Sequence, residues 1–303
     1  PVTGLIDVHA HFVPDLYREA LVRHGHDQPD GFPVIPEWSA EEHVAVMDRV
    51  GIEASVLSIS SPGIHLGDEG PDLARMVNEA GRRAVVDHPG RFGLFASLPL
   101  PDLDATMTEI AHCCDHLDVD GFALMTHVDG TYLGDPALDP VFAELDRRRA
   151  RVFIHPTSPP CWERTAHGRP RPMIEFLFDT TRAVVDLVLS GTIARYPGID
   201  VIVPHAGATL PMVADRVSVF SLLLDSGVDV LGDLGRLHYD VAGYPLPRQL
   251  DALLTLVPPD HLHYGSDHPF TPELAVAASR ERLAETGALA PLRANTERLL
   301  DRT

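Results

Sequence analysis

The chain has 303 residues, of which 45% are hydrophobic and 22% are charged, and its formal net charge is −20. This composition is typical of a folded globular protein and excludes a disordered chain, a collagen-like fibre and a coiled coil. The strong negative charge argues against binding to nucleic acid or to an anionic membrane surface. A small acidic substrate remains compatible with it, because local cations dominate at short range.

Short apolar runs alternate with helical patterns along the first half of the chain. Strands are predicted over 5–9, 54–59, 92–97 and 121–125. Helices are predicted over 39–51, from about residue 72, over 104–117 and from about 140 to 149. Ser39 and Glu42 have the spacing of a capping box, which marks the start of the first of these helices.

The same alternation continues through the second half. Strands are predicted over 151–154, 200–203, 237–241 and 261–265, and helices over 178–195, from about 210, over 248–256 and at the end of the chain. Strands that alternate with helices form parallel sheets through right-handed crossovers. Eight such units predict a single (β/α)8 TIM barrel over 1–303. A doubly wound open sheet is the alternative, although no G-x-G-x-x-G motif follows the first strand.

Two proline-rich segments interrupt this repeat. One is an insertion after the first strand, over 12–38, and the other is a long loop after the fifth strand, over 157–173. Because both follow a strand, both are predicted to lie at the C-terminal face of the barrel. Long loops at this face usually bind substrate or cover the site.

The chain contains 17 histidines, and several of them directly follow predicted strands. His9 and His11 follow the first strand, and side chains two residues apart on a strand lie on the same face. His155 follows the fifth strand and Asp267 follows the eighth. Since the C-terminal ends of barrel strands form one mouth, we expect these four side chains to hold one divalent metal ion with a position left open.

Zinc suits a set of three imidazole nitrogens and one carboxylate, and manganese is the alternative. Taken alone, His155, His205 and Asp267 each have an ordinary structural explanation, and only their common position at strand ends favours a site. The pairs His24/His26 and His261/His263 do not lie at that end, because the first is in a polar loop and the second begins the eighth strand.

The chain resembles the metal-dependent amidohydrolase superfamily nearly from end to end, in the branch related to aminocarboxymuconate semialdehyde decarboxylase. The motifs that carry the resemblance are Asp7-Val8-His9-Ala10-His11, Phe153-Ile154-His155-Pro156, His205-Ala206-Gly207 and Gly265-Ser266-Asp267. Segments 60–63 and 178–182 are also similar to the 6-methylsalicylate decarboxylase group. The resemblance implies that His9, His11, His155 and Asp267 bind the metal and that His205 is catalytic.

The resemblance also implies that Arg216, eleven residues after His205, acts across a homodimer and binds a substrate carboxylate in the neighbouring subunit. Arg182 is an alternative for that carboxylate, because a guanidinium matches it in two places. Phe12 and Trp162 are candidates to stack on a flat ring. Cys161 lies in the loop after the fifth strand and is a weaker candidate for contact with substrate.

The leading functional hypothesis is non-oxidative decarboxylation of an aromatic or conjugated carboxylic acid, such as an ortho-hydroxybenzoate, with Asp267 or His205 delivering a proton. The alternative is hydrolysis of a lactone or amide by a metal-activated water. A metal-storing or metal-sensing barrel without enzymatic activity is a third hypothesis. The three cysteines do not form a disulfide framework, and neither a signal peptide nor a transmembrane segment is evident, so a cytoplasmic location is expected.

Overall fold

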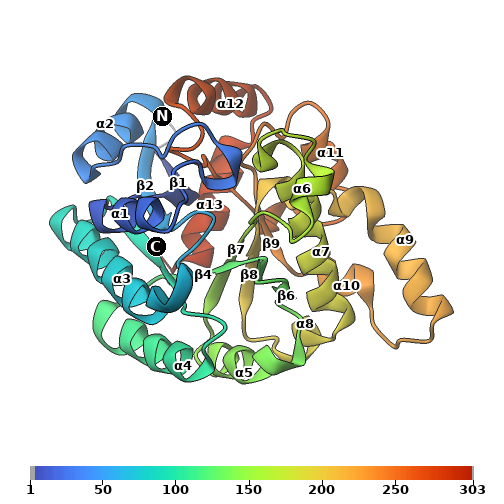
Figure 1. Ribbon diagram of the computed structural model, residues 1–303. Coiled ribbons are helices and arrows are strands. Elements are labelled where there is room, and N and C mark those ends of the chain that lie inside the picture. The colour runs from blue at the N-terminus through green and yellow to red at the C-terminus, as the bar shows by residue number, and fades with distance from the viewer. Residues whose placement is uncertain (1–3, 302–303) are drawn as a thin grey trace.

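Eight parallel strands form the centre of the fold, which a computed structural model describes for residues 4–301 (Figure 1). Each strand pairs with the next one along the sheet. The strands are β1 (Leu5–His11), β2 (Ile52–Ser58), β3 (Phe92–Ser97), β4 (Gly121–Met125), β7 (Arg151–His155), β8 (Asp200–Val203), β9 (His238–Asp240) and β10 (Leu262–His263).

The first and last strands close this sheet into a barrel. Parallel bridges join Asp7 to Tyr264 and Ala10 to His268. The predicted (β/α)8 barrel is therefore confirmed, and the open sheet is wrong. Closure also brings the C-terminal end of β1 beside the segment 265–268.

Helices surround the barrel (Figure 1). They are α1 (Asp15–Arg23), α2 (Ala40–Val50), α3 (Gly70–Asp87), α4 (Leu103–His112), α5 (Asp139–Arg147), α6 (Trp162–Thr165), α7 (Glu175–Leu189), α8 (Thr192–Arg195), α9 (Leu210–Leu223), α10 (Val230–Gly235), α11 (Gln249–Leu253), α12 (Glu273–Glu285) and α13 (Leu289–Leu299). Across residues 4–301, none of them combines the length and the apolar sequence required to cross a bilayer.

The barrel interior is closed by apolar side chains. Phe95 and Phe153 stack at a ring-centroid distance of 5.7 Å. They belong to a buried cluster that includes Ile6, Val8, Ala54, Val56, Ala123 and Ile202. Because this packing fills the middle of the barrel, polar side chains that point inward can gather only near its ends.

The helix predicted from Ser39 to Gly51 is confirmed at both ends. Ser39 Oγ accepts a hydrogen bond from the backbone N–H of Glu42 at 3.1 Å, which caps α2. Gly51 then adopts a left-handed conformation with φ of 76°, which ends the helix.

Two other predicted helices differ from those observed. The helix predicted over 178–195 is divided into α7 and α8, because Gly191 between them has φ of 75°. The helix predicted over 104–117 ends at His112, and a π-helical turn over Cys113–Leu117 completes the segment.

The two insertions contain more regular structure than their prolines indicate. The segment 12–38 includes the nine-residue helix α1, whose Tyr17, Ala20 and Leu21 are buried. The segment 157–173 includes α6 and a 3-10 turn over Arg171–Met173. A two-stranded antiparallel hairpin, β5 (His127–Val128) and β6 (Thr131–Tyr132), also follows β4 and was not predicted.

Candidate metal centre

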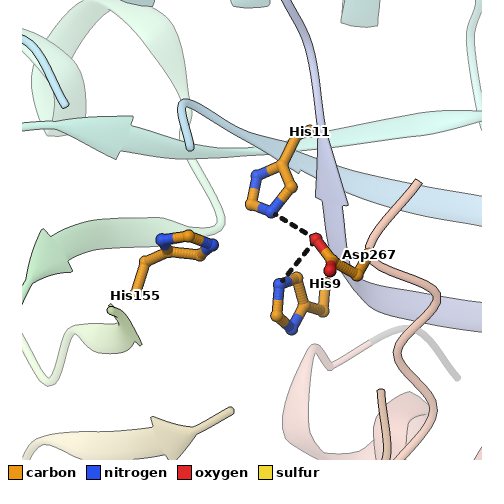
Figure 2. Close-up of side chains that lie close together, drawn as sticks. All are labelled: His9, His11, His155 and Asp267. Atoms are coloured by element: carbon orange, nitrogen blue, oxygen red, sulfur yellow. Dashed lines mark ion pairs between the residues drawn. The ribbon is translucent and has the colours of Figure 1, made fainter. Parts of the chain in front are cut away.

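Four side chains from three parts of the chain meet at the C-terminal end of the barrel. His9 and His11 come from β1, His155 ends β7, and Asp267 follows β10. One ligand atom from each residue lies within 4.8 Å of the ligand atoms of the other three. Figure 2 shows the three imidazoles around the Asp267 carboxylate.

The closest contacts converge on one oxygen. Asp267 Oδ1 is 3.2 Å from His11 Nε2 and 3.5 Å from His9 Nε2 (Figure 2). Both nitrogens are buried, yet neither has a partner in hydrogen-bond geometry among the described residues. Burial of an imidazole nitrogen without a partner is costly. A cation shared by these atoms would satisfy them, so the donor set fits a divalent metal ion.

The other ring nitrogen of each histidine is already engaged. His11 Nδ1 donates to the carbonyl of Ser58 at 3.2 Å, and His155 Nδ1 donates to the carbonyl of Pro156 at 2.8 Å. Because a carbonyl oxygen only accepts, each Nδ1 carries a hydrogen. In the neutral rings this leaves the Nε2 lone pair free to bind a metal.

His9 is held by a buried carboxylate. Its Nδ1 lies 2.8 Å from Asp240 Oδ2, and both side chains are fully buried. Burial opposes protonation of His9, but Asp240 and then Asp267 raise its pKa to about 10. A metal ion at Nε2 would replace the proton there and keep the hydrogen bond to Asp240.

The remaining ligands favour the forms that bind metals. Burial lowers the pKa of His155 well below its usual range, with His11 and His9 adding to the effect, and burial also lowers the pKa of His11. Burial alone would raise the pKa of Asp267, but the neighbouring imidazoles hold it well below the usual value for a carboxyl. Neutral histidines and an ionised carboxylate are the forms that coordinate a cation.

His205 lies beside this cluster. Its ring centroid is 5.0 Å from that of His9, and its Nε2 is 3.8 Å from Asp267 Oδ2. The backbone at His205 has φ of 55°, an uncommon conformation for a residue with a side chain. Asp240 Oδ1 accepts the His205 N–H at 3.0 Å, and Gln249 Nε2 donates to the His205 carbonyl at 2.6 Å. These two bonds hold the strained turn in place.

A cavity of about 700 Å³ opens next to the metal centre. Both insertions line it, and the residues that they contribute are Gly25, His26, Gln28, Asp30, 157–160, Trp162, Glu163 and Arg171. The four candidate ligands do not line it themselves. It adjoins them at β7, because the lining residue Thr157 follows His155 by two positions and the lining residue Met125 is the strand partner of His155.

The structure places the predicted substrate-binding residues differently from one another. Trp162 lines the cavity. Phe12 instead packs in the hydrophobic core against Trp38, with ring centroids 5.8 Å apart, so we do not assign it contact with substrate. Arg182 is half exposed on α7, and its Nη1 lies 3.8 Å from Asp179 Oδ1. Arg216 is exposed on α9, 5.2 Å from the ring centroid of Phe220.

Three residues with evident roles around the cluster were not found from the sequence. Each of them hydrogen-bonds to a histidine from another strand or turn: Asp240 to His9, Ser58 to His11 and Gln249 to His205. Asp240 did carry a signal, because a carboxylate inside a predicted apolar strand needs a buried partner. Cys161 is partly buried beside Trp162, and all three cysteines are free thiols.

Known proteins that are similar to this chain indicate the family to which it belongs. The amidohydrolase family model matches residues 6–302. The 6-methylsalicylic acid decarboxylase of Penicillium expansum is 36% identical over 282 residues, which cover 89% of this chain and 86% of that protein.

Solved structures extend the comparison to the fold. The crystal structure of an amidohydrolase II is 35% identical with a TM-score of 0.93, covering 98% of this chain and 100% of that one. A dihydroxybenzoic acid decarboxylase of Polaromonas sp. JS666, solved with bound manganese, is 20% identical with a TM-score of 0.81, covering 99% and 97%, and shares the fold. This chain therefore belongs to the amidohydrolase family, within its decarboxylase branch.

Proposed function

We propose that this protein is a metal-dependent decarboxylase of an aromatic carboxylic acid, with an ortho-hydroxybenzoate such as 6-methylsalicylate as the substrate class. The observation that carries the proposal is the convergence of three buried imidazoles and the Asp267 carboxylate beside a cavity large enough for an aromatic acid. The similarity to a 6-methylsalicylic acid decarboxylase supports the choice of substrate class.

His9, His11, His155 and Asp267 would hold the ion. A divalent ion there would supply Lewis-acid polarisation of the substrate carboxylate and its neighbouring hydroxyl oxygen. Three nitrogens and one oxygen favour zinc, and the manganese in a decarboxylase of the same fold makes manganese the alternative. Elemental analysis of the purified protein, followed by reconstitution with each ion, distinguishes the two.

Asp267 and His205 would hold and deliver the proton, since Asp267 Oδ2 lies 3.8 Å from His205 Nε2. A proton passes from this pair to the ring carbon that bears the carboxylate. The bond between that carbon and the carboxylate then breaks, its electron pair restores the aromatic ring, and CO₂ leaves. Proton delivery of this kind contributes about 10²- to 10⁴-fold to the rate.

The test is CO₂ release from a panel of hydroxybenzoic acids by metal-loaded enzyme. In D₂O, the product should carry one deuterium at the carbon that lost the carboxylate. Asp267→Asn should abolish turnover. Asp260→Asn is the control and should not, because Asp260 is exposed and precedes β10, whereas Asp267 follows it. Full activity in Asp267→Asn would refute the assigned role.

We further propose that α9 forms a homodimer interface and that Arg216 acts in the partner's site. Helix α9 extends outward from the barrel (Figure 1). Several of its apolar side chains are exposed, with Met212 at 78% and Leu222 at 75%, and an exposed apolar patch of this kind typically marks an interface. Arg216 lies on the same helix.

Light scattering after size-exclusion chromatography tests the dimer. Leu222→Asp should produce a monomer, whereas Leu274→Asp, on the distant α12, should not. Mixing inactive Arg216→Ala with inactive Asp267→Asn should then restore part of the activity, because one mixed site carries neither change. Absence of recovery would refute action of Arg216 across the interface.

The three cysteines are free, which suits a reducing compartment, and we propose a cytoplasmic location on that basis. Fractionation of the native host tests it.

A further inference from the structure

The cavity beside the metal centre contains a cation that the reaction described above does not use. Arg171 is the one arginine or lysine among the described residues that line this cavity. It belongs to the second insertion, and its guanidinium carbon lies 4.1 Å from the centroid of the Trp162 ring. Stacking on an aromatic face fixes the plane of a guanidinium and leaves its edges free for planar hydrogen bonding.

A chain of hydrogen bonds orients the Arg171 side chain. Arg171 Nε donates to Ser158 Oγ at 3.0 Å, and Ser158 Oγ donates to the carboxylate of Asp30. Asp30 comes from the first insertion, so the two insertions meet at this point. The chain occupies one side of the guanidinium and determines where its two terminal nitrogens point.

The two terminal nitrogens have different surroundings, because Nη1 packs so closely against Gly31 that a Cβ atom there would clash with it. Among the described residues, neither Nη atom makes a hydrogen bond or an ion pair, so the hydrogens of Nη2 remain available to a ligand. Asp30 and Glu163 are the acidic groups nearby, but neither places an oxygen within 4.0 Å of the guanidinium nitrogens. Partial burial lowers the pKa of Arg171, although a guanidinium stays charged in proteins. A partly desolvated charge with free donors attracts a planar anion strongly.

The cavity that Arg171 lines lies beside the end of β7, which carries a candidate metal ligand. Its lining includes Thr157, two residues after His155, and Met125, which is the strand partner of His155. A flat acid whose reacting carboxylate lies at the metal ligands would therefore extend its ring into the cavity. The far edge of that ring would face the wall formed by Trp162 and Arg171.

We propose that Arg171, backed by Trp162, is a specificity-determining residue that binds a second carboxylate on the substrate ring, remote from the carboxylate that is lost. This inference rests on the proposed decarboxylase function. Because Arg171 would contact only the remote group, it would act on substrate binding and not on the chemical step. Its removal should therefore raise KM for a dicarboxylate and leave kcat nearly unchanged.

The kinetic test compares salicylate with 5-carboxysalicylate, which differ by one remote carboxylate. Arg171→Gln should raise KM for 5-carboxysalicylate about 10- to 100-fold and change KM for salicylate less than about twofold. Arg169→Gln removes an exposed arginine from the same loop and should change neither. Equal increases for both substrates would show that Arg171 only holds the insertions together, and no increase for either would also overturn the proposal.

Arg171→Lys guards against misfolding of the glutamine variant. Lysine keeps the positive charge but loses the fork of donors, so the discrimination between the two substrates should fall without disappearing. A thermal unfolding midpoint equal to that of the unmodified protein would confirm that the variant is folded. Unchanged discrimination in a folded lysine variant would show that planar recognition is absent.

A binding measurement separates this inference from the proposed reaction. The chain has two tryptophans, so Trp38→Phe leaves Trp162 as the reporter of the cavity. Isophthalate should quench its fluorescence at concentrations at least tenfold lower than benzoate, and Arg171→Gln should remove the difference. If no acid is decarboxylated but this difference holds, the proposed function fails and the role of Arg171 stands. If salicylates are decarboxylated and neither KM nor acid binding depends on Arg171, the proposed function stands and the role of Arg171 fails.

Discussion

The imidazole of His9 donates its Nδ1 hydrogen to Asp240 Oδ2 at 2.8 Å, with both side chains fully buried. The second oxygen of Asp240 accepts the backbone N–H groups of His205 at 3.0 Å and Ala242 at 2.9 Å. One carboxylate thus orients a candidate metal ligand and also the turn that carries the candidate catalytic histidine. Its position explains how residues from β1 and from the end of β8 act as one site.

Asp240→Asn should weaken metal binding. Asparagine can still accept the two backbone N–H groups through its oxygen, but its NH₂ group cannot accept the hydrogen of His9 Nδ1. His9 would then favour the tautomer with a hydrogen on Nε2, which cannot coordinate. We expect a 10- to 100-fold loss of metal affinity, measured by competition with a chromogenic chelator.

Asp251→Asn provides the control for Asp240→Asn, because Asp251 is exposed on α11. It should bind metal like the unmodified protein. Unchanged metal affinity in a folded Asp240→Asn protein would show that the hydrogen bond to His9 is unnecessary for coordination.

A residue of this site could be predicted from the sequence only where a regular pattern determines its position. His9 and His11 could be predicted because alternation along one strand places both on one face, and the barrel prediction then placed His155 and Asp267 at the same end. Arg171 could not be predicted, because no periodicity determines the path of a proline-rich loop.

The prediction of the fold was also limited to segments that have a clear sequence pattern. Most strands could be predicted because they are largely apolar runs, as expected of a parallel sheet buried on both faces. The short strands β9 and β10 are exceptions, since they contain His238, Asp240 and His263. Helix α1 was missed because the prolines around it indicated a loop, and the apolar face of a nine-residue helix is a short signal. The break at Gly191 was missed because an isolated glycine is also tolerated within helices.

Removal of the metal should lower the thermal stability of the protein. The unpaired Nε2 atoms of His9 and His11 would then remain buried without a ligand. An ion at a hundredfold excess over its Kd stabilises the folded state by about 3 kcal/mol, which corresponds to a shift of several degrees. Scanning calorimetry before and after chelation measures this shift in the unfolding midpoint.

His155→Ala should abolish this response to metal, and His65→Ala should retain it. His65 lines the cavity but lies outside the ligand cluster, so it controls for loss of an imidazole nearby. An equal gain of stability on metal addition in all three proteins would place the ion elsewhere.

Gly265→Ala should disturb the metal centre through packing alone. A Cβ atom at Gly265 would lie 2.9 Å from His9 Cβ and 3.1 Å from Asp240 Cγ, both closer than normal contact. Both neighbours are buried, so relief requires that the ligand or its partner move. Overpacking of this kind typically costs about 1–3 kcal/mol. We expect a lower unfolding midpoint together with weaker metal binding.

Gly235→Ala is the matched control, because a Cβ atom there would meet its nearest neighbour at an ordinary 3.7 Å. It should change neither the unfolding midpoint nor metal affinity. Normal metal binding by Gly265→Ala would mean that the site tolerates displacement of His9 or Asp240.

The opposite end of the barrel should contribute to acid sensitivity through His238. Burial, reinforced by the stacked His261 ring at 4.7 Å, lowers the pKa of His238 to about 4, although Asp260 opposes the shift. The unfolded chain takes up this proton near pH 6.5. Between about pH 6.5 and 4 the unfolded state therefore binds more protons, and stability must fall as the pH falls. A pKa difference of this size corresponds to a loss on the order of 3 kcal/mol from this group.

His238→Asn removes the titrating group, so its unfolding midpoint should fall less than that of the unmodified protein between pH 7 and pH 4. The exposed His167→Asn should follow the unmodified protein over the same range. Most other groups titrate alike in all three proteins and cancel in the comparison, so the difference reports on His238 together with His263, whose Nε2 lies 2.9 Å from His238 Nδ1. Parallel pH profiles for His238→Asn and the unmodified protein would mean that His238 is protonated in the folded state as readily as in the unfolded chain, despite its burial.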